Sequence, residues 1–363
     1  MKDKVGVGVI GCGRISGQYL ENLVRRFSFC LQVVACADLV PAHAEQRAQE
    51  YGLDRVCPVD ELLADSQVEL VVNLTVPAAH YEVTMAALDA GKHVYTEKPL
   101  AVTRQEGRQL VDTAAKRGLL IGGAPDTFLG AGLQTCRKLI DDGWVGTPIT
   151  AQALIAMGVN VERYHKRGVG PMFDMGPYYV TALIALLGPV KRVSGSAQLP
   201  FATKANPDPQ APDFCQSYTV DTPTNVSGVL DFCSGAVGVV TTTCEVFGYN
   251  PRLEVYGTEG ILTCNDPNMF GGPVCIQRRG GERQEVALTH YYSDRNRGLG
   301  IADMAYAIRD GRAPRASGDL MYHVHDVMHA VHDASRENTY VYPESRVERP
   351  MPFPAGFRPH IFR

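Results

Sequence analysis

The chain has 363 residues, of which 45% are hydrophobic and 20% charged, a composition typical of a globular protein long enough for two domains. Its formal net charge of −4 gives no reason to expect a nucleic acid or a membrane surface as a partner, and no apolar run is long enough to predict a membrane span. Ten scattered cysteines without a Cys-x-x-Cys pair indicate reduced thiols, so we expect a cytoplasmic protein.

The first third of the chain alternates strands with helices. Apolar runs predict strands at residues 5–11, 31–38, 68–77, 92–99 and 118–125, and helical stretches separate them. Buried strands joined by helical crossovers indicate a parallel sheet that is covered on both faces. We therefore predict an α/β chain whose first domain, residues 1–124, is a doubly wound Rossmann sheet that binds NAD(P).

The pattern of predicted elements changes after residue 125. Strand-rich segments joined by short turns fill roughly residues 190–290, which favours antiparallel pairing. Two helical stretches follow, at roughly 298–310 and 318–336. We expect residues 125–363 to form an α+β domain with an open, mainly antiparallel sheet that binds substrate and forms oligomers. Its C-terminal helices should pack back on the Rossmann domain.

A glycine-rich loop follows the first predicted strand. The stretch "VIGCGRISG" gives Gly11-x-Gly13-x-x-Ser16, with Arg14 and Ile15 inside the loop. Gly11 permits a tight turn, Gly13 lets the backbone approach a pyrophosphate, and a small third residue lets helix and strand pack closely. The start of the following helix offers N–H groups to phosphates. This pattern predicts a dinucleotide site.

Asp38 ends the second predicted strand at about the interval expected for a residue that binds the adenosine ribose. A carboxylate accepts hydrogen bonds from both ribose hydroxyls and repels a 2′-phosphate. No cation follows it closely, and Arg47 lies more than two helical turns further along the chain. We therefore expect NAD rather than NADP.

The stretch "FDMGPYYV" (173–180) opens a predicted apolar helix. Asp174 can cap the helix N-terminus, and Pro177 is tolerated in the first turn. Residues four apart share a helix face, so Asp174 and Tyr178 can also point together toward a substrate.

The segment "TEKPL" (96–100) lies at the end of a predicted parallel strand, where open α/β sheets place their ligands. Together with the fingerprint, "NLTVPAAH" (73–80) and the Asp-x-Gly-x-Tyr stretch, it resembles the glucose–fructose oxidoreductase/inositol dehydrogenase/rhizopine catabolism (Gfo/Idh/MocA) family over nearly the whole chain. The resemblance implies that the dinucleotide is held by a set of residues from four segments: Gly11, Gly13, Arg14, Ile15, Asp38, Thr75, Pro77, His80, Glu97 and Lys98. It also implies that Pro99 shapes the last of these segments, commonly after a cis peptide.

The resemblance makes Lys98 the residue that bonds the reacting hydroxyl and helps to move its proton. Many relatives carry Asp-x-x-x-His, with the histidine as general base, but this chain has Tyr178 at that position. An ammonium beside Tyr178 would favour phenolate, so Tyr178 next to Lys98 can act as the acid and base. Two alternatives stay open: Lys98 takes the proton itself, or His165 replaces the missing imidazole.

Other polar residues have both functional and structural interpretations. Asp126 follows the last strand of the first domain and either contacts a polyol or caps a helix. His325, His329 and His332 have helical spacing, but no accompanying acidic ligands or His-Glu-x-x-His motif support a metal site. We expect no metal.

Together with these patterns, the resemblance implies an NAD-dependent enzyme that interconverts a secondary alcohol of a sugar, glycoside or cyclitol with its ketone, with Asp174 holding a neighbouring hydroxyl. A homodimer or homotetramer is expected through the open sheet face. Two other functions fit the resemblance: a glycoside-cleaving enzyme that retains NAD and oxidises its substrate transiently, and a non-catalytic sensor of dinucleotide and sugar.

Overall fold

The structure, a computed structural model, describes residues 4–166, 168–353 and 355. Contacts divide these residues into two units. The N-terminal unit comprises residues 4–129 and 294–322, and the C-terminal unit comprises the other described residues. The domain boundary predicted after residue 124 stays a prediction. No helix among the described residues has both the length and the apolar character needed to cross a membrane.

The N-terminal unit contains the predicted parallel sheet. Its five strands lie in the order β2-β1-β3-β4-β5, and all pairs are parallel. The strands are β1 (Val5–Ile10), β2 (Leu31–Ala37), β3 (Leu70–Asn73), β4 (His93–Thr96) and β5 (Ile121–Gly123). Every residue of β1 and β3 is buried, as expected for strands covered on both faces.

Helices cover both faces of this sheet. They are α1 (Ser16–Glu21), the π-helix η1 (Asn22–Arg26), α2 (Pro41–Tyr51), α3 (Val59–Ala64), the 3₁₀-helix η2 (Pro77–Ala79), α4 (His80–Asp89), α5 (Arg104–Lys116), the 3₁₀-helix η3 (Thr127–Leu129), α9 (Leu299–Asp310) and the start of α10 (Gly318–Glu337). Leu62 of α3, Leu88 of α4 and Leu110 of α5 share one core with Met321 of α10. Thr103 and Glu106 form a capping box that fixes where α5 begins.

α9 returns to the N-terminal unit although about 165 residues separate it from the preceding part of that unit. It packs against β5, and Arg309 near its end forms two hydrogen bonds with Glu69, at 2.6 and 2.7 Å. A Cβ at Gly300 would lie 2.6 Å from Tyr95 Oη, so only glycine allows this close packing of helix and strand. The predicted helices near 298–310 and 318–336 are thus confirmed.

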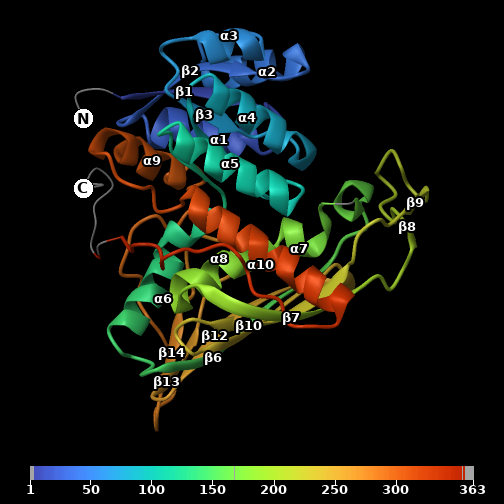
Figure 1. Cartoon of the computed structure of the whole chain (residues 1–363), viewed down its shortest axis with the longest axis vertical. Coiled ribbons are helices and arrows are strands. Elements are labelled where there is room, and N and C mark those ends of the chain that lie inside the picture. Colours follow the sequence, from blue (N-terminus) through green and yellow to red (C-terminus); the bar gives the residue numbers. More distant parts are fainter. Residues whose placement is uncertain (1–3, 167, 354, 356–363) are drawn as a thin grey trace. The chain divides into compact units, whose positions relative to one another are not determined.

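The C-terminal unit is built on a mixed, mostly antiparallel sheet in the order β15-β14-β13-β12-β6-β11-β10-β7. Only β6 and β11 pair in parallel in this sheet. The strands are β6 (Pro148–Gly158), β7 (Val190–Gln198), β10 (Asn225–Phe232), β11 (Val237–Thr243), β12 (Glu245–Gly257), β13 (Gly260–Thr263), β14 (Cys275–Arg278) and β15 (Arg283–Glu285). Two short strands, β8 (Thr203–Ala205) and β9 (Ser217–Thr219), pair apart from this sheet (Figure 1). The predicted fold class is confirmed.

Helices cover one face of the larger sheet. They are α6 (Ala131–Asp141), the 3₁₀-helix η4 (Glu162–His165), α7 (Gly170–Asp174), α8 (Gly176–Leu187) and the remainder of α10. Figure 1 shows α6, α8 and α10 on the same side of this sheet. The opposite face carries exposed Val229, Val237 and Val239, with Arg192 paired to Asp231 beside them. This face is open in the described chain.

α8 is buried at every position, because it packs on β6 and β11 and also against α6 and α7. A uniformly apolar helix is stable only where its whole circumference is covered, and "YYVTALIALL" meets that condition. The sequence therefore correctly indicated a helix here, although its start differs from the prediction, as described below.

His323 of α10 joins the helix to two other segments. The Val190 N–H donates to His323 Nε2 at 3.0 Å, so that nitrogen must carry a lone pair. The other ring nitrogen, Nδ1, lies 2.7 Å from Ser345 Oγ. Burial lowers the pKa of His323 to about 4, with Arg346 acting in the same direction. The neutral ring is thus part of the packing.

We expect this histidine to make folding sensitive to acid. The unfolded chain takes up the proton near pH 6.5, whereas the folded chain resists it down to about pH 4, so stability present above pH 6.5 is lost as the pH falls between these values. A single such group contributes a slope of about 1.4 kcal/mol per pH unit. Urea unfolding of the wild type and His323→Gln from pH 8 to 4.5 should show a shallower slope for the variant below pH 6.5 and parallel curves above pH 7. Parallel curves throughout would contradict this.

Candidate active site

The glycine-rich loop lies between β1 and α1. Gly11 has φ +98°, and a Cβ there would lie 2.6 Å from the backbone of Leu74, so this position requires glycine. A Cβ at Gly13 would meet no described atom within 4 Å. Ser16 takes the third glycine's place, and its Oγ donates to the Gly13 carbonyl at 2.6 Å. This bond ties the first residue of α1 back to the glycine-rich loop.

Asp38 follows β2 beside this loop. One carboxylate oxygen accepts the Cys12 N–H at 2.7 Å and the other accepts the Val40 N–H at 2.8 Å. The carboxylate is therefore held at the mouth of the loop, as the fingerprint predicts. One of these bonds comes from the glycine-rich loop and the other from the backbone that follows Asp38, and His43 Nδ1 lies 3.5 Å from Asp38 Oδ1.

Arg47 of α2 also reaches the loop. Its guanidinium donates to Ser16 Oγ at 3.1 Å and to the Gly13 carbonyl at 3.2 Å, and it pairs with Glu50 at 2.5 Å. Although Arg47 lies more than two helical turns beyond Asp38 in sequence, it reaches the loop because α2 packs beside α1. Arg47 is thus a cation next to the loop that the sequence reasoning discounted.

The Glu97-Lys98-Pro99 segment begins at the carboxyl end of β4. Glu97 is buried, and one of its carboxylate oxygens accepts the Tyr19 hydroxyl at 2.6 Å while the other accepts the Lys98 N–H at 3.0 Å. Burial raises the pKa of Tyr19 well above its usual value, and the Glu97 charge adds to this, so the phenol keeps the proton that it donates. The cis peptide expected before Pro99 is present.

His80 connects two loops at the same edge of the sheet. Its Nδ1 lies 2.6 Å from the Pro99 carbonyl oxygen, and its Nε2 lies 3.0 Å from that of Thr75. The ring is completely buried, and burial lowers its pKa. This geometry lets His80 hold the two loops together. The cofactor contact predicted for it stays a prediction.

Thr75 and Pro77 lie in the loop after β3, as predicted. Asn73, which the sequence analysis did not single out, organises this loop. Its Oδ1 accepts from Thr75 Oγ1 at 2.6 Å, and its Nδ2 donates to the His80 carbonyl at 3.1 Å. Thr75 is partly exposed and Pro77 begins η2.

Asp126 is completely buried and forms bonds with the start of α9. Its Oδ2 accepts the Gly298 N–H at 2.8 Å and the Gly300 N–H at 3.1 Å. Burial raises the pKa of this carboxyl, whereas nearby Arg297 opposes the rise. The geometry fits the helix-cap interpretation of Asp126, whose Oδ1 has no hydrogen-bond partner among the described residues. The polyol contact stays a prediction.

The Asp174–Tyr178 arrangement differs from the prediction. Asp174 is the last residue of the short α7, and α8 begins at Gly176 with Met175 between the helices. Asp174 therefore does not cap α8, whose start has no side-chain cap, and the two residues are not one turn apart on a continuous helix. Asp174 is partly exposed and Tyr178 is 5% exposed.

His165 is completely buried at the end of η4. Its Nδ1 lies 3.0 Å from the Val161 carbonyl oxygen, and its Nε2 lies 3.3 Å from Lys204 Nζ. Burial lowers the pKa of the ring. Each ring nitrogen thus has a partner within the C-terminal unit. Substrate binding and proton transfer by His165 stay predictions.

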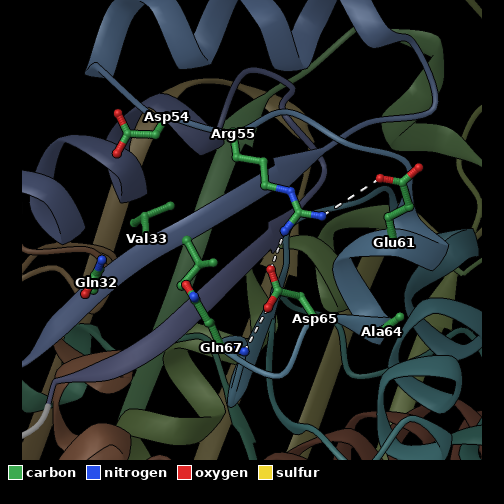
Figure 2. A pocket seen from close by; sticks show the side chains of 9 residues that line it. Gln32, Val33, Asp54, Arg55, Glu61, Ala64, Asp65 and Gln67 are labelled. Carbon is green, nitrogen blue, oxygen red and sulfur yellow. Dashed lines mark hydrogen bonds and ion pairs between the residues drawn. The ribbon is translucent and has the colours of Figure 1, made fainter.

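One cavity of about 600 Å³ lies away from these residues, along the amino-terminal half of β2. Figure 2 shows Arg55 pointing toward Asp65 and Glu61 inside it, and Asp65 also accepts the Gln67 N–H at 2.8 Å. Asp38 follows the opposite end of β2, so this cavity is separate from the glycine-rich loop. Three of its charged side chains pair with one another, since Arg55 contacts both Asp65 and Glu61.

Comparison with known proteins agrees with this geometry. A family model described as "Oxidoreductase family, NAD-binding Rossmann fold" matches residues 5–123, and one described as "GFO/IDH/MocA C-terminal domain" matches residues 133–263. The 1,5-anhydro-D-fructose reductase of Ensifer adhaerens is 32% identical over 307 residues, which cover 79% of this chain and 86% of that protein.

The chain belongs to the Gfo/Idh/MocA oxidoreductase family.

A second relative, an inositol 2-dehydrogenase/D-chiro-inositol 3-dehydrogenase of Lactiplantibacillus plantarum, is 35% identical over 147 residues, which cover 39% of this chain and only 41% of that protein. Among solved structures, levoglucosan dehydrogenase in complex with NADH and levoglucosan matches with a TM-score of 0.83 at 19% identity, covering 94% of this chain and all of that one. The latter likeness shows the shared fold. The family assignment confirms the resemblance identified from "TEKPL".

The two interpretations of Asp126 in this Gfo/Idh/MocA protein can be separated by substitution. Asp126→Asn keeps an oxygen that can accept both glycine N–H groups, whereas Asp126→Ala leaves them buried without an acceptor, which costs about 1–3 kcal/mol. We expect urea unfolding to show a clear loss in the free energy of unfolding for Asp126→Ala and a much smaller loss for Asp126→Asn. The KM for a sugar substrate should be similar in both variants and the wild type. A raised sugar KM in a stably folded Asp126→Asn would instead support the polyol contact.

Proposed function

We propose that this chain is a cytoplasmic NAD-dependent dehydrogenase that interconverts a secondary hydroxyl of a sugar or cyclitol with the corresponding ketone. The observation that carries the proposal is the position of Glu97-Lys98-Pro99 at the carboxyl end of β4, on the same sheet edge as the glycine-rich loop and Asp38. The names of the relatives, which are reductases and dehydrogenases of anhydrosugars and inositols, support this substrate class.

The dinucleotide fits the residues at this edge. Gly11, Gly13, Arg14 and Ile15 would hold the pyrophosphate against the start of α1, and Asp38 would accept from the ribose hydroxyls. Thr75, Pro77 and Glu97 belong to the loops that follow β3 and β4, where the nicotinamide half is expected. Bound nicotinamide supplies the hydride acceptor for alcohol oxidation.

The Asp38 carboxylate should set the preference for NAD. We expect the wild type to have a higher kcat/KM with NAD than with NADP. Asp38→Ser should lower kcat/KM for NAD about 10–100-fold, the cost of losing a charged hydrogen-bond acceptor, and should raise kcat/KM for NADP.

The double variant Asp38→Ser/Arg47→Met tests whether the nearby guanidinium supports the 2′-phosphate. If it does, the gain in kcat/KM for NADP disappears in the double variant. A wild-type enzyme that prefers NADP would show that Asp38 does not exclude the phosphate.

Lys98 and Tyr178 are assigned the proton chemistry. Hydride leaves a carbinol carbon only as its hydroxyl proton departs, so a cation that stabilises the alkoxide and a group that accepts the proton are both needed. Lys98 supplies the ammonium, and its segment is fixed by Tyr19, Glu97 and His80 as described above. Tyr178 takes the proton, and partly exposed Asp174 binds a neighbouring hydroxyl.

Substitution of Lys98 should separate chemistry from binding. Lys98→Met should lower kcat for a sugar or inositol substrate about 10²–10⁴-fold, with the Kd for NAD nearly unchanged. Lys116→Met, an exposed lysine of the same unit, serves as the matched control. Turnover is followed by the near-ultraviolet absorbance of reduced nicotinamide across a panel of sugars, glycosides and inositols. Near-normal turnover by Lys98→Met would overturn the assignment of the site.

The same assay identifies the general base. Tyr178→Phe should lower kcat more than about tenfold if Tyr178 takes the proton, and Tyr179→Phe controls for loss of a neighbouring buried hydroxyl. A small effect of Tyr178→Phe on kcat would leave proton transfer to Lys98 or His165.

Assembly would use the open face of the eight-stranded sheet. Exposed Val229, Val237 and Val239 form an apolar strip on neighbouring strands, which supports a homodimer or homotetramer. Light scattering at increasing protein concentration measures the oligomeric state, and a persistent monomer would contradict the proposal.

A further inference from the structure

Three metal-ligating side chains meet in the C-terminal unit, and none of them is assigned to hydride transfer. His165 ends η4, Cys244 lies between β11 and β12, and Glu245 begins β12. One ligand atom from each lies within 4.8 Å of the others. We call these residues the His-Cys-Glu cluster. His165 and Cys244 are at most 3% exposed, and the Glu245 side chain is 9% exposed.

The His165 ring is held in the orientation that a metal ligand requires. The Val161 carbonyl can only accept a hydrogen bond, so His165 Nδ1, 3.0 Å away, carries the hydrogen. The lone pair is then on Nε2, which lies 3.6 Å from Cys244 Sγ. Metal-bound histidines commonly donate their second ring N–H to a carbonyl or carboxylate in this way.

Glu245 has one occupied and one unoccupied acceptor. Its Oε2 pairs with Lys204 Nζ at 2.9 Å. Its Oε1 is buried without a hydrogen-bond partner among the described residues. A buried carboxylate oxygen without a partner is costly, so this atom favours binding of a cation or a donor.

Lys204 shows that the cluster attracts positive charge. Its ammonium lies 3.3 Å from His165 Nε2 and also donates to the Val159 carbonyl at 3.1 Å. Because Lys204 belongs to β8, outside the larger sheet, its flexible side chain can give up His165 while keeping Glu245 Oε2 and Val159.

We propose that the His-Cys-Glu cluster binds a divalent thiophilic transition metal, with zinc as the best fit, and that the Lys204 ammonium competes for the same place. The ligands would be His165 Nε2, Cys244 Sγ and Glu245 Oε1. With bonds of about 2.0 Å to nitrogen and about 2.3 Å to sulfur, tetrahedral zinc places its ligand atoms about 3.5 Å apart. The 3.6 Å between His165 Nε2 and Cys244 Sγ matches this spacing.

The chemistry of the donors favours zinc over magnesium or calcium. Thiolate and imidazole are ligands of zinc and other late transition metals, whereas magnesium and calcium take oxygen ligands. Three protein ligands leave a fourth position, which water can fill. The cysteine thiol gives up its proton to solvent when the metal binds, and no oxidation or reduction takes place.

Cobalt is the probe, because a thiolate bound to Co²⁺ gives a near-ultraviolet charge-transfer band and tetrahedral Co²⁺ gives visible bands. The full-length chain, purified without a metal-binding tag and treated with a chelator, is titrated with CoCl₂ under anaerobic conditions. We expect one equivalent to bind with both signals and ZnCl₂ to displace it. Lys204→Met keeps all three ligands and should lower the Kd for Co²⁺ at least about tenfold, because the competing ammonium is removed.

Matched variants decide whether this cluster is the site. Cys244→Ser should abolish the charge-transfer band, and His165→Gln should weaken binding at least about tenfold, whereas Cys233→Ser, at an exposed cysteine of the same unit, should change nothing. Circular dichroism checks the fold of each variant, and if Cys244→Ser does not fold, His165→Gln decides. The proposal is overturned if the wild type gives no band, including the case in which only Lys204→Met binds cobalt. It is also overturned if the band persists in a folded Cys244→Ser or His165→Gln.

Discussion

Parallel strands all end at the same edge of their sheet, and the chemistry of the N-terminal unit depends on this constraint. It brings together loops that are far apart in sequence: the glycine-rich loop after β1, Asp38 after β2, Thr75 after β3 and Lys98 after β4. The sheet by itself fixes only where these loops begin. Their course beyond the strands is set by buried polar contacts, in which the hydroxyl of Tyr19 holds Glu97 and the ring of His80 holds the backbone at Pro99.

Such contacts are strong restraints because they are buried. A polar atom in a low-dielectric interior loses much of its free energy if its partner moves away, so the arrangement resists distortion. A lysine on a segment held in this way needs little reorganisation when charge develops on a substrate oxygen, which is the condition for effective electrostatic stabilisation. Tyr19 and Asn73 therefore matter to the site although neither carries a reactive group.

The sequence predicted those features that depend on local pattern. The Gly11–Ser16 loop, Asp38 and the segment at Lys98 are each recognisable from a strand and the few residues after it, and the structure places them accordingly. Prediction failed where the outcome depends on packing. The break at Met175 separates Asp174 from Tyr178, and nothing in "FDMGPYYV" marks it, because Gly176 and Pro177 suit either one helix start or a junction of two.

Distance along the chain was misleading for other residues. Arg47 is remote from Gly13 in sequence and touches it in space because α2 folds back. His165 and Cys244 are separated by 79 residues, and their spacing resembles no metal motif. Asp126 allowed both a cap and a ligand contact, and its hydrogen bonds to the start of α9, about 170 residues later, could not be seen in the local sequence.

The return of α9 to the N-terminal unit affects how the protein can be made. During synthesis the five parallel strands emerge first, but the amides that donate to Asp126 Oδ2 and the helix that packs against Tyr95 emerge only from residue 298 onward. Until then β5 lacks the helix that packs on it, and Asp126 Oδ2 lacks its N–H donors. Completion of the dinucleotide-binding unit therefore waits for translation of most of the C-terminal unit, so the two units cannot mature independently in chain order.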